Sequence, residues 1–196
     1  MKVKWLHILL LLGIVYSSCA QEFQYAFKEK QYEITKVGML TLGSWALGNI
    51  AINGALVSQA EGSTKYFHEM NIYWNLVNLA IAGGGYWVNN KNRNKAYSPY
   101  DLVKEQAKIE KTLLFNAGLD VAYMAIGQLL KERAKNINDR LERLKGFGNG
   151  LILQGAFLFV FDLSLHAIHV HHRNKAQKNF QQIKFSLNIS GIRMYF

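Results

Sequence analysis

Four long apolar segments alternate with charged connections along this chain. They cover residues 37–58, 70–88, 112–130 and 150–170, and none of them contains lysine or arginine. Each is close to the roughly 20 residues that a helix needs to cross a hydrocarbon core. A helix of a soluble bundle shows a charged outer face to water, and these segments lack one. The pattern therefore predicts an all-α fold, a bundle of four transmembrane helices.

The alternative is a soluble, periplasmic four-helix bundle. Polar residues occur in every segment, and the mean hydropathy of the whole chain is close to zero. Outside those polar positions, however, the segments consist mostly of Leu, Ile, Val, Phe, Ala and Gly. Because such faces are unfavourable in water and favourable in lipid, the membrane interpretation is preferred.

Each apolar segment carries two polar side chains four residues apart, which places both on one face of a helix. Polar groups in hydrocarbon are costly without partners, so these faces should meet inside the bundle. We therefore expect a polar core in which asparagines form hydrogen bonds between helices. Its predicted amide members are Asn49, Asn53, Asn71, Asn75, Asn78 and Asn116.

Two carboxyl groups share these polar faces, and each needs a partner, a proton or an ion. Histidine with carboxylate is a common ligand set for zinc or iron. The candidate metal ligands are His68, Glu69, Asp120, Asp162 and His166. Spacing does not fix their relative depths, so a packed Asp162–His166 pair without metal remains the alternative, and no cofactor is assigned. His169, His171 and His172 are expected to approach a helix end before Arg173, where the helix dipole favours them without a metal.

Residues 1–20 resemble a secretory signal peptide. Two lysines precede an apolar run, and small residues end it, so cleavage is expected after Ala20. Cys19 also permits a lipoprotein signal, although the large Tyr16 three residues before it fits that pattern poorly. Cys19 is the only cysteine, so the cleaved chain would hold no disulfide and no cysteine-bound metal.

The chain is basic, with a formal net charge of +10. Its lysines and arginines lie in the connections rather than along one helix face, and no nucleic-acid motif accompanies them, so nucleic acid is not expected as a partner. Membrane-flanking charge is the better interpretation. If the signal peptide is removed on the outer side, the outer segments hold about twice as many lysines and arginines as the inner ones, which is opposite to the positive-inside rule.

Two shorter segments carry local signals. In "SPYDLVKEQAKIEK", Ser98 is a predicted N-cap with Pro99 at the first helical position, and the segment is expected to be an amphipathic surface helix before the third apolar segment. In the tail, apolar residues alternate with polar ones over residues 183–189, which predicts a short C-terminal β strand or hairpin.

The expected organisation has four parts. They are a signal peptide over residues 1–20, an extracytoplasmic tail over 21–36, a four-helix membrane domain over 37–172 and a C-terminal tail over 173–196. The stretches "GSWALGNIAING", "KYFHEMNIYWNLVNLAIAGGGY" and "NAGLDVAYMAIG" resemble uncharacterised four-helix membrane proteins of Bacteroidota-type bacteria. That resemblance implies a fold and a cell-envelope location, and it brings no catalytic residues with it.

No enzymatic motif stands out. There is no phosphate-binding loop, and Ser164 lies two residues from both Asp162 and His166, so the three do not share a helical face. The predicted function is therefore a non-enzymatic structural or accessory protein of the inner membrane. A small proton or cation transporter and a membrane-embedded metal-dependent hydrolase are the alternatives. The expected partners are the lipid bilayer and either further copies of the chain or another membrane protein.

Overall fold

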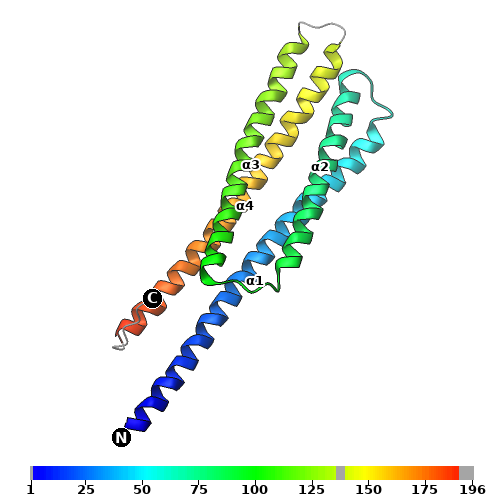
Figure 1. Cartoon of the computed structure of the whole chain (residues 1–196). Coiled ribbons are helices and arrows are strands. Elements are labelled where there is room, and N and C mark those ends of the chain that lie inside the picture. The colour runs from blue at the N-terminus through cyan, green and yellow to red at the C-terminus, as the bar shows by residue number, and fades with distance from the viewer. Residues whose placement is uncertain (1, 136–139, 190–196) are drawn as a thin grey trace.

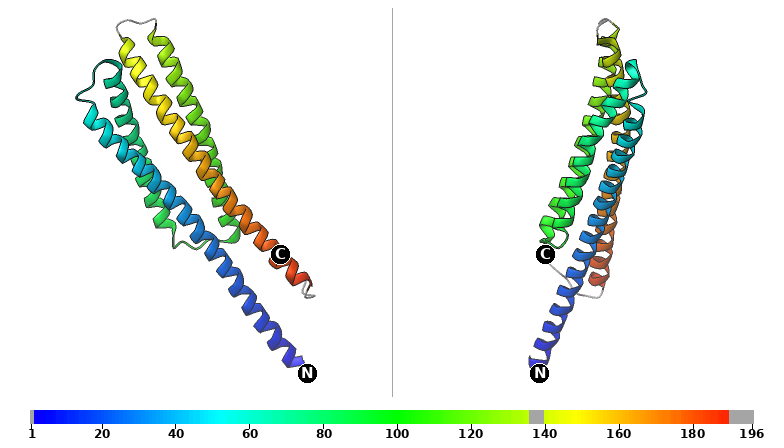
Figure 2. Two further views of the ribbon diagram at one scale, coloured as in Figure 1. Left: turned by 180° about the vertical axis from the view of Figure 1, so that it is seen from behind. Right: turned by 90° about the vertical axis from the view of Figure 1, so that its right-hand side faces the viewer.

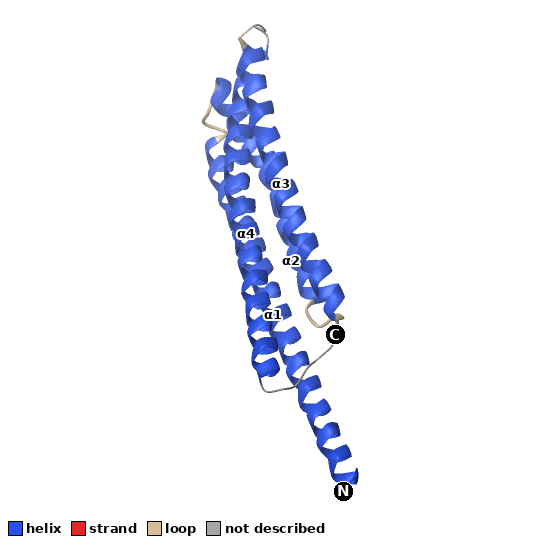
Figure 3. Ribbon diagram, turned by 90° about the vertical axis from the view of Figure 1, so that its left-hand side faces the viewer, coloured by secondary structure: helices blue, strands red, loops and turns tan. Residues whose placement is uncertain are grey.

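The computed structural model describes residues 2–135 and 140–189, with side chains for 21–135 and 140–179. Its elements are α1 (Lys2–Leu56), α2 (Gly62–Asn92), α3 (Pro99–Ala134) and α4 (Leu141–Ile189). The described residues contain helices and connections but no strand (Figure 3), so the all-α prediction is confirmed. Two antiparallel hairpins, α1–α2 and α3–α4, lie side by side as an elongated bundle (Figure 1, Figure 2). The connection over residues 93–98 joins them at one end, called here the α2–α3 end.

The start of α3 follows the predicted signal. The Ser98 hydroxyl accepts a hydrogen bond from the Asp101 backbone N–H at 3.2 Å, and Pro99 occupies the first helical turn. The helix then runs unbroken to Ala134, so the segment expected to be a separate surface helix is the first part of α3, with one face packed against the bundle and the other exposed. Leu102 and Gln106 are buried there. The prediction of a separate helix was wrong, and the buried face of this segment includes polar residues, which look solvent-exposed in the sequence.

The residues expected to form an N-terminal tail are helical. Positions 21–36 belong to α1, and Gln31, Tyr32 and Ile34 are buried against the rest of the bundle. The limits of the signal peptide and of the membrane domain remain predictions. At the other terminus, residues 173–189 continue α4, and residues 190–196 lie outside the described part. The predicted strand is therefore wrong over 183–189, because a helix propagates more easily than an isolated strand forms without a partner.

Glycines allow α3 and α4 to pack closely. A Cβ atom placed on Gly127 would lie 2.6 Å from the Gly148 carbonyl oxygen, and one on Gly148 would lie 2.5 Å from the Gly127 carbonyl oxygen. Only glycine at both positions lets the two backbones approach this closely. On the other side of α4, the Trp45 ring stacks on Phe157 with centroids 3.7 Å apart, which fixes α1 against α4.

The apolar core consists of two small clusters. One contains Ile34, Leu113 and Leu165, and the other contains Leu42, Ala82 and Leu158. Among the side chains that the structure describes, twelve polar or charged ones are also buried, whereas large apolar side chains on all four helices are exposed. Two helical stretches, Pro99–Ala134 and Leu141–Asn179, are long and apolar enough to cross a membrane, which points weakly to a membrane protein.

Candidate functional site

The buried polar side chains form two clusters and one carboxyl pair along the bundle axis. The first cluster lies away from the α2–α3 end and is centred on Gln154 of α4, which is fully buried. The Gln154 amide nitrogen donates to the Asn71 side-chain oxygen at 2.5 Å, and its oxygen accepts from the Trp45 indole at 3.2 Å. One glutamine therefore connects α1, α2 and α4 through both ends of its amide.

The asparagines of this first cluster are satisfied largely within their own helices. Asn75 donates to the Asn71 carbonyl at 2.8 Å, and Asn53 donates to the Asn49 carbonyl at 2.8 Å. Between helices, the Asn53 side-chain oxygen lies 2.7 Å from His68 Nδ1, a hydrogen bond that joins α1 to α2. Fully satisfied groups of this kind hold helices in register and leave little capacity to bind a ligand.

The carboxyl groups of Asp120 on α3 and Asp162 on α4 face each other within reach of a side-chain hydrogen bond. Both side chains are buried. A hydrogen bond between two carboxyl groups requires a proton on one of them, because two carboxylates offer only acceptors. One proton shared by the two carboxyl groups would meet this requirement; Asp120 Oδ2 is buried and has no hydrogen-bond partner among the described residues.

Apolar clusters close both sides of this carboxyl pair. Along α4, Leu158 precedes Asp162 and Leu165 follows it, and each leucine belongs to one of the two apolar clusters. Along α3, Leu113 separates Asp120 from the polar residues nearer the α2–α3 end. No hydrogen bond between described residues connects the pair with either polar cluster.

The second cluster lies nearer the α2–α3 end and is built around α3. Gln106, which is 1% exposed, accepts a hydrogen bond from the Gln31 amide at 3.0 Å. Its own amide donates to Glu110 at 2.9 Å and to the His169 backbone carbonyl at 3.0 Å. This side chain therefore connects α1, α3 and α4, as Gln154 connects α1, α2 and α4 in the first cluster.

An ion pair completes the second cluster. The Glu110 carboxylate, with 6% side-chain exposure, pairs with the Arg173 guanidinium, which is 35% exposed. His166 on α4 lies with Nδ1 3.0 Å from the Glu110 backbone carbonyl. His169, fully buried beside this group, has no hydrogen-bond partner on either ring nitrogen among the described residues. The cluster thus brings one anion and one cation together near the end of the bundle.

The five candidate metal ligands do not converge. His68 pairs with Asn53, the two aspartates pair with each other, and His166 contacts the α3 backbone. Glu69 follows His68 on α2 and is half-buried. Within the described ranges, no three His, Cys, Asp or Glu side chains come close enough to hold a metal ion. The geometry brings together only the two aspartates of the proposed ligand set.

Residues 41–163 match the model described as "Family of unknown function (DUF6992)". The chain belongs to this family. No curated protein and no solved structure matches the chain. The predicted resemblance to a family of unknown function is confirmed to that extent. The DUF6992 match spans the first cluster, the aspartate pair and the α3 half of the second cluster.

Within this DUF6992 chain, four of the six predicted amide residues are buried, but the hydrogen bonds that their amide nitrogens donate stay within single helices. Asn53, Asn71, Asn75 and Asn78 are buried, and they form side-chain hydrogen bonds. Asn49 and Asn116 are only half-buried. Asn49 donates to the Trp45 carbonyl at 2.9 Å, so it caps a turn of its own helix instead of bridging two helices.

Sequence reasoning missed the side chains that make the most interhelical contacts. Gln154 stands alone in its apolar segment, with no polar residue four positions away on either side. Gln106 and Glu110 lie outside the apolar segments, in the stretch interpreted as a surface helix. A signal was present, since Gln106, Glu110, Leu113, Ala117 and Asp120 follow one another at spacings of three or four. When the helical face that contains Asp120 is followed toward the start of α3, it includes both Glu110 and Gln106.

Proposed function

We propose that this DUF6992 chain is an integral protein of the bacterial cell envelope whose four helices all cross the membrane. The observation that carries the proposal is the inverted distribution of polarity. Amides, carboxyls and imidazoles occupy the interior, while large apolar side chains such as Leu47, Val77 and Phe115 are exposed. In water both features cost free energy, whereas in lipid both are expected.

The dimensions of the exposed apolar surface support the proposal that the helices cross a membrane. On α1, exposed apolar side chains run from Val37 to Leu56, about 28 Å at 1.5 Å per residue. On α2 they run from Tyr73 to Val88, and on α4 from Leu153 to Ile168, each about 23 Å. A typical hydrocarbon core is about 30 Å thick. We call this surface the apolar belt.

The described parts of α1 and α2 have no membrane-length stretch as apolar as those of α3 and α4, and this difference is compatible with membrane crossing. The polar residues that reduce the average of α2 are His68, Asn71, Asn75 and Asn78, and all four are buried. An average over sequence counts them as if they faced the solvent. The side chains that α2 presents outward, including Leu76 and Ile81, are apolar.

Within the membrane, we infer a non-enzymatic structural or accessory role. The support is the state of the polar core, in which Gln154 and Gln106 each connect three helices through satisfied hydrogen bonds. Such groups stabilise one arrangement of helices. No nucleophile with an adjacent base occurs among the contacts of the described residues.

Membrane integration is tested with a substitution on the apolar belt. Val160, 64% exposed on α4, is replaced by aspartate, and Lys178→Asp beyond the belt is the control. In lipid, Val160→Asp costs about 2.5–3.5 kcal/mol. We therefore expect less protein in the carbonate-resistant membrane fraction for Val160→Asp only. A wild-type chain that stays in solution without detergent would refute the proposal, as would a Val160→Asp variant that integrates normally.

The aspartate pair supports a second candidate, a proton-handling membrane protein. Asp120 and Asp162 share a site that needs one proton, as groups in proton relays do. The test is pH-driven proton flux in proteoliposomes, with Asp120→Asn and Asp162→Asn beside Asp101→Asn, a control at the exposed start of α3. Flux that is lost only in the two core variants would establish this candidate. Equal flux in all four proteins would exclude it.

A further inference from the structure

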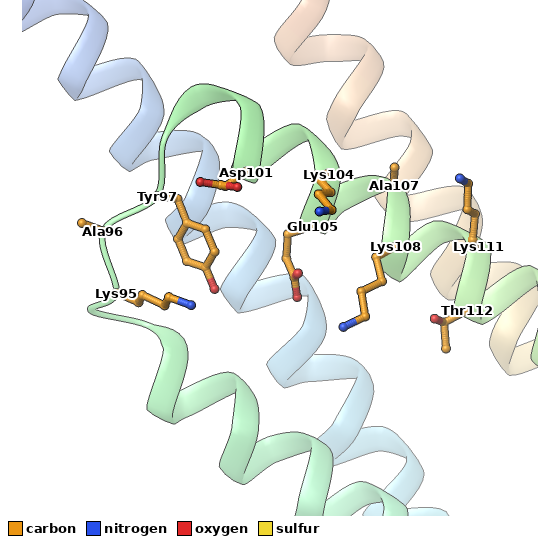
Figure 4. Close-up of a pocket in the computed structure, with 10 residues that line it drawn as sticks. All are labelled: Lys95, Ala96, Tyr97, Asp101, Lys104, Glu105, Ala107, Lys108, Lys111 and Thr112. Atoms are coloured by element: carbon orange, nitrogen blue, oxygen red, sulfur yellow. The ribbon is translucent and has the colours of Figure 1, made fainter.

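An open hollow of about 650 Å³ lies where the α2–α3 connection meets the first turns of α3 (Figure 4). Lys95 and Tyr97 form its wall on the connection, and α3 forms the rest. The complete lining is Lys95, Ala96, Tyr97, Asp101, Lys104, Glu105, Ala107, Lys108, Lys111 and Thr112. The hollow is separate from both polar clusters and from the aspartate pair, because none of its lining residues belongs to them.

Cations dominate this hollow. Lys104, Lys108 and Lys111 recur at spacings of four and three, so they form one stripe along α3. Among the described residues none of these three ammonium groups has an ion-pair or hydrogen-bond partner. Of the two carboxylates in the lining, Asp101 already hydrogen-bonds with the Ser98 hydroxyl at 2.7 Å. Four lysines facing two carboxylates leave the hollow positive.

The opposite wall adds a hydrogen-bond donor and further positive charge. The Lys28 ammonium lies 4.6 Å from the centre of the Tyr97 ring, and the Lys95 ammonium lies 5.2 Å from it. Burial, together with the nearby Glu105 and Asp101, raises the pKa of Tyr97, so its hydroxyl keeps its proton at neutral pH. A protonated phenol donates to anionic oxygen atoms.

The position of the hollow relative to the apolar belt indicates the class of ligand. Leu114 and Phe115, 55% and 67% exposed, follow Lys111 and Thr112 directly along α3. Exposed apolar side chains therefore continue along α3 directly beyond the cationic stripe. A molecule with an anionic group in the hollow and hydrocarbon chains beside Phe115 would match both surfaces at once, and an anionic phospholipid has that composition.

We propose that this hollow binds the phosphate of an anionic phospholipid headgroup, held by the Lys104–Lys108–Lys111 stripe and the Tyr97 hydroxyl, with the acyl chains along α3. The inference rests on the proposed membrane insertion. It goes beyond general membrane-flanking charge because the cations are gathered around one hollow on one helix.

The test uses the full chain purified in a neutral detergent, with lipid binding measured by native mass spectrometry. Phosphatidylglycerol is the anionic probe and phosphatidylcholine is the neutral probe. The stripe variant carries Lys104→Gln, Lys108→Gln and Lys111→Gln. The matched control carries Lys65→Gln, Arg140→Gln and Lys145→Gln, three exposed cations at the opposite end of the bundle. Circular dichroism checks that all three proteins have the same helix content.

We expect wild type and control to retain phosphatidylglycerol over phosphatidylcholine, and the stripe variant to lose about a hundredfold of its phosphatidylglycerol affinity. Equal loss in both triple variants would overturn the proposal, because surface charge anywhere would then suffice. Glycerol phosphate that binds as tightly as the lipid would also overturn it, by assigning the hollow to a free phosphate compound. Membrane integration is measured separately by carbonate extraction, so failure of lipid binding and failure of the proposed function give different results.

Discussion

Replacing Gly127 by alanine should weaken the α3–α4 hairpin, which carries the aspartate pair and the Glu110–Arg173 ion pair. The new Cβ would lie 2.6 Å from the Gly148 carbonyl oxygen and 2.8 Å from Ile152 Cγ1. The first of these neighbours is backbone, so relief requires the two helices to separate. Separation would affect every contact between them, including those that position Asp120.

The magnitude follows from two opposing effects. Alanine in place of glycine favours the helix by about 1 kcal/mol. Overpacking against a neighbouring backbone costs about 1–3 kcal/mol, and close to the upper value where no side chain is able to rotate away. We expect Gly127→Ala to lower the free energy of unfolding by about 1–2 kcal/mol after the helix gain is subtracted.

Gly118→Ala is the matched control on the same helix, since a Cβ there meets no atom within 4 Å. It should retain the helix gain of up to about 1 kcal/mol without the clash. The assay is thermal unfolding in detergent, followed by intrinsic tryptophan fluorescence and helical circular dichroism. A Gly127→Ala variant as stable as Gly118→Ala would refute the close α3–α4 packing described above.

The two interhelical clusters give the remaining predictions, both measured by the same unfolding assay. Gln154→Leu keeps the side-chain volume but leaves the Trp45 indole and the Asn71 side-chain oxygen unpartnered. The free energy of unfolding should therefore fall by about 1–3 kcal/mol. An unchanged unfolding midpoint would contradict the bridging role of Gln154. Arg173→Ala leaves the buried Glu110 carboxylate without its ion-pair partner and should lower the free energy of unfolding by about 1–3 kcal/mol. This loss is smaller than for a fully buried ion pair because Arg173 is partly exposed. Adding Glu110→Gln should recover much of that loss, and no recovery would show that the arginine acts through other contacts.

Sequence periodicity was sufficient for the all-α class and the start of α3, and it picked out four asparagines that are buried. These follow from local rules, such as the Ser98 cap and the four-residue spacing of Asn71 and Asn75. The rules work here because each depends on residues within one or two turns of a single helix.

The second cluster could not be predicted as an assembly from spacing alone. Its contacts join positions far apart in the chain, such as Gln31 with Gln106 and Glu110 with Arg173. Whether a glutamate on a helix faces water or another helix depends on the rotation of the whole helix within the bundle. That rotation is set by contacts elsewhere, including the Gly127–Gly148 approach, which local patterns do not encode.

The order of polar and apolar layers bears on the choice between the two proposed functions. A proton moving from the Glu110–Arg173 pair to the aspartates would have to pass the layer formed by Ile34, Leu113 and Leu165. On the opposite side, the Leu158 layer separates the aspartates from Gln154. Proton transfer needs a chain of donors and acceptors, and neither layer supplies one. A proton shared by Asp120 and Asp162 would be enclosed by apolar layers on both sides and would join α3 to α4, which favours the proposed structural role.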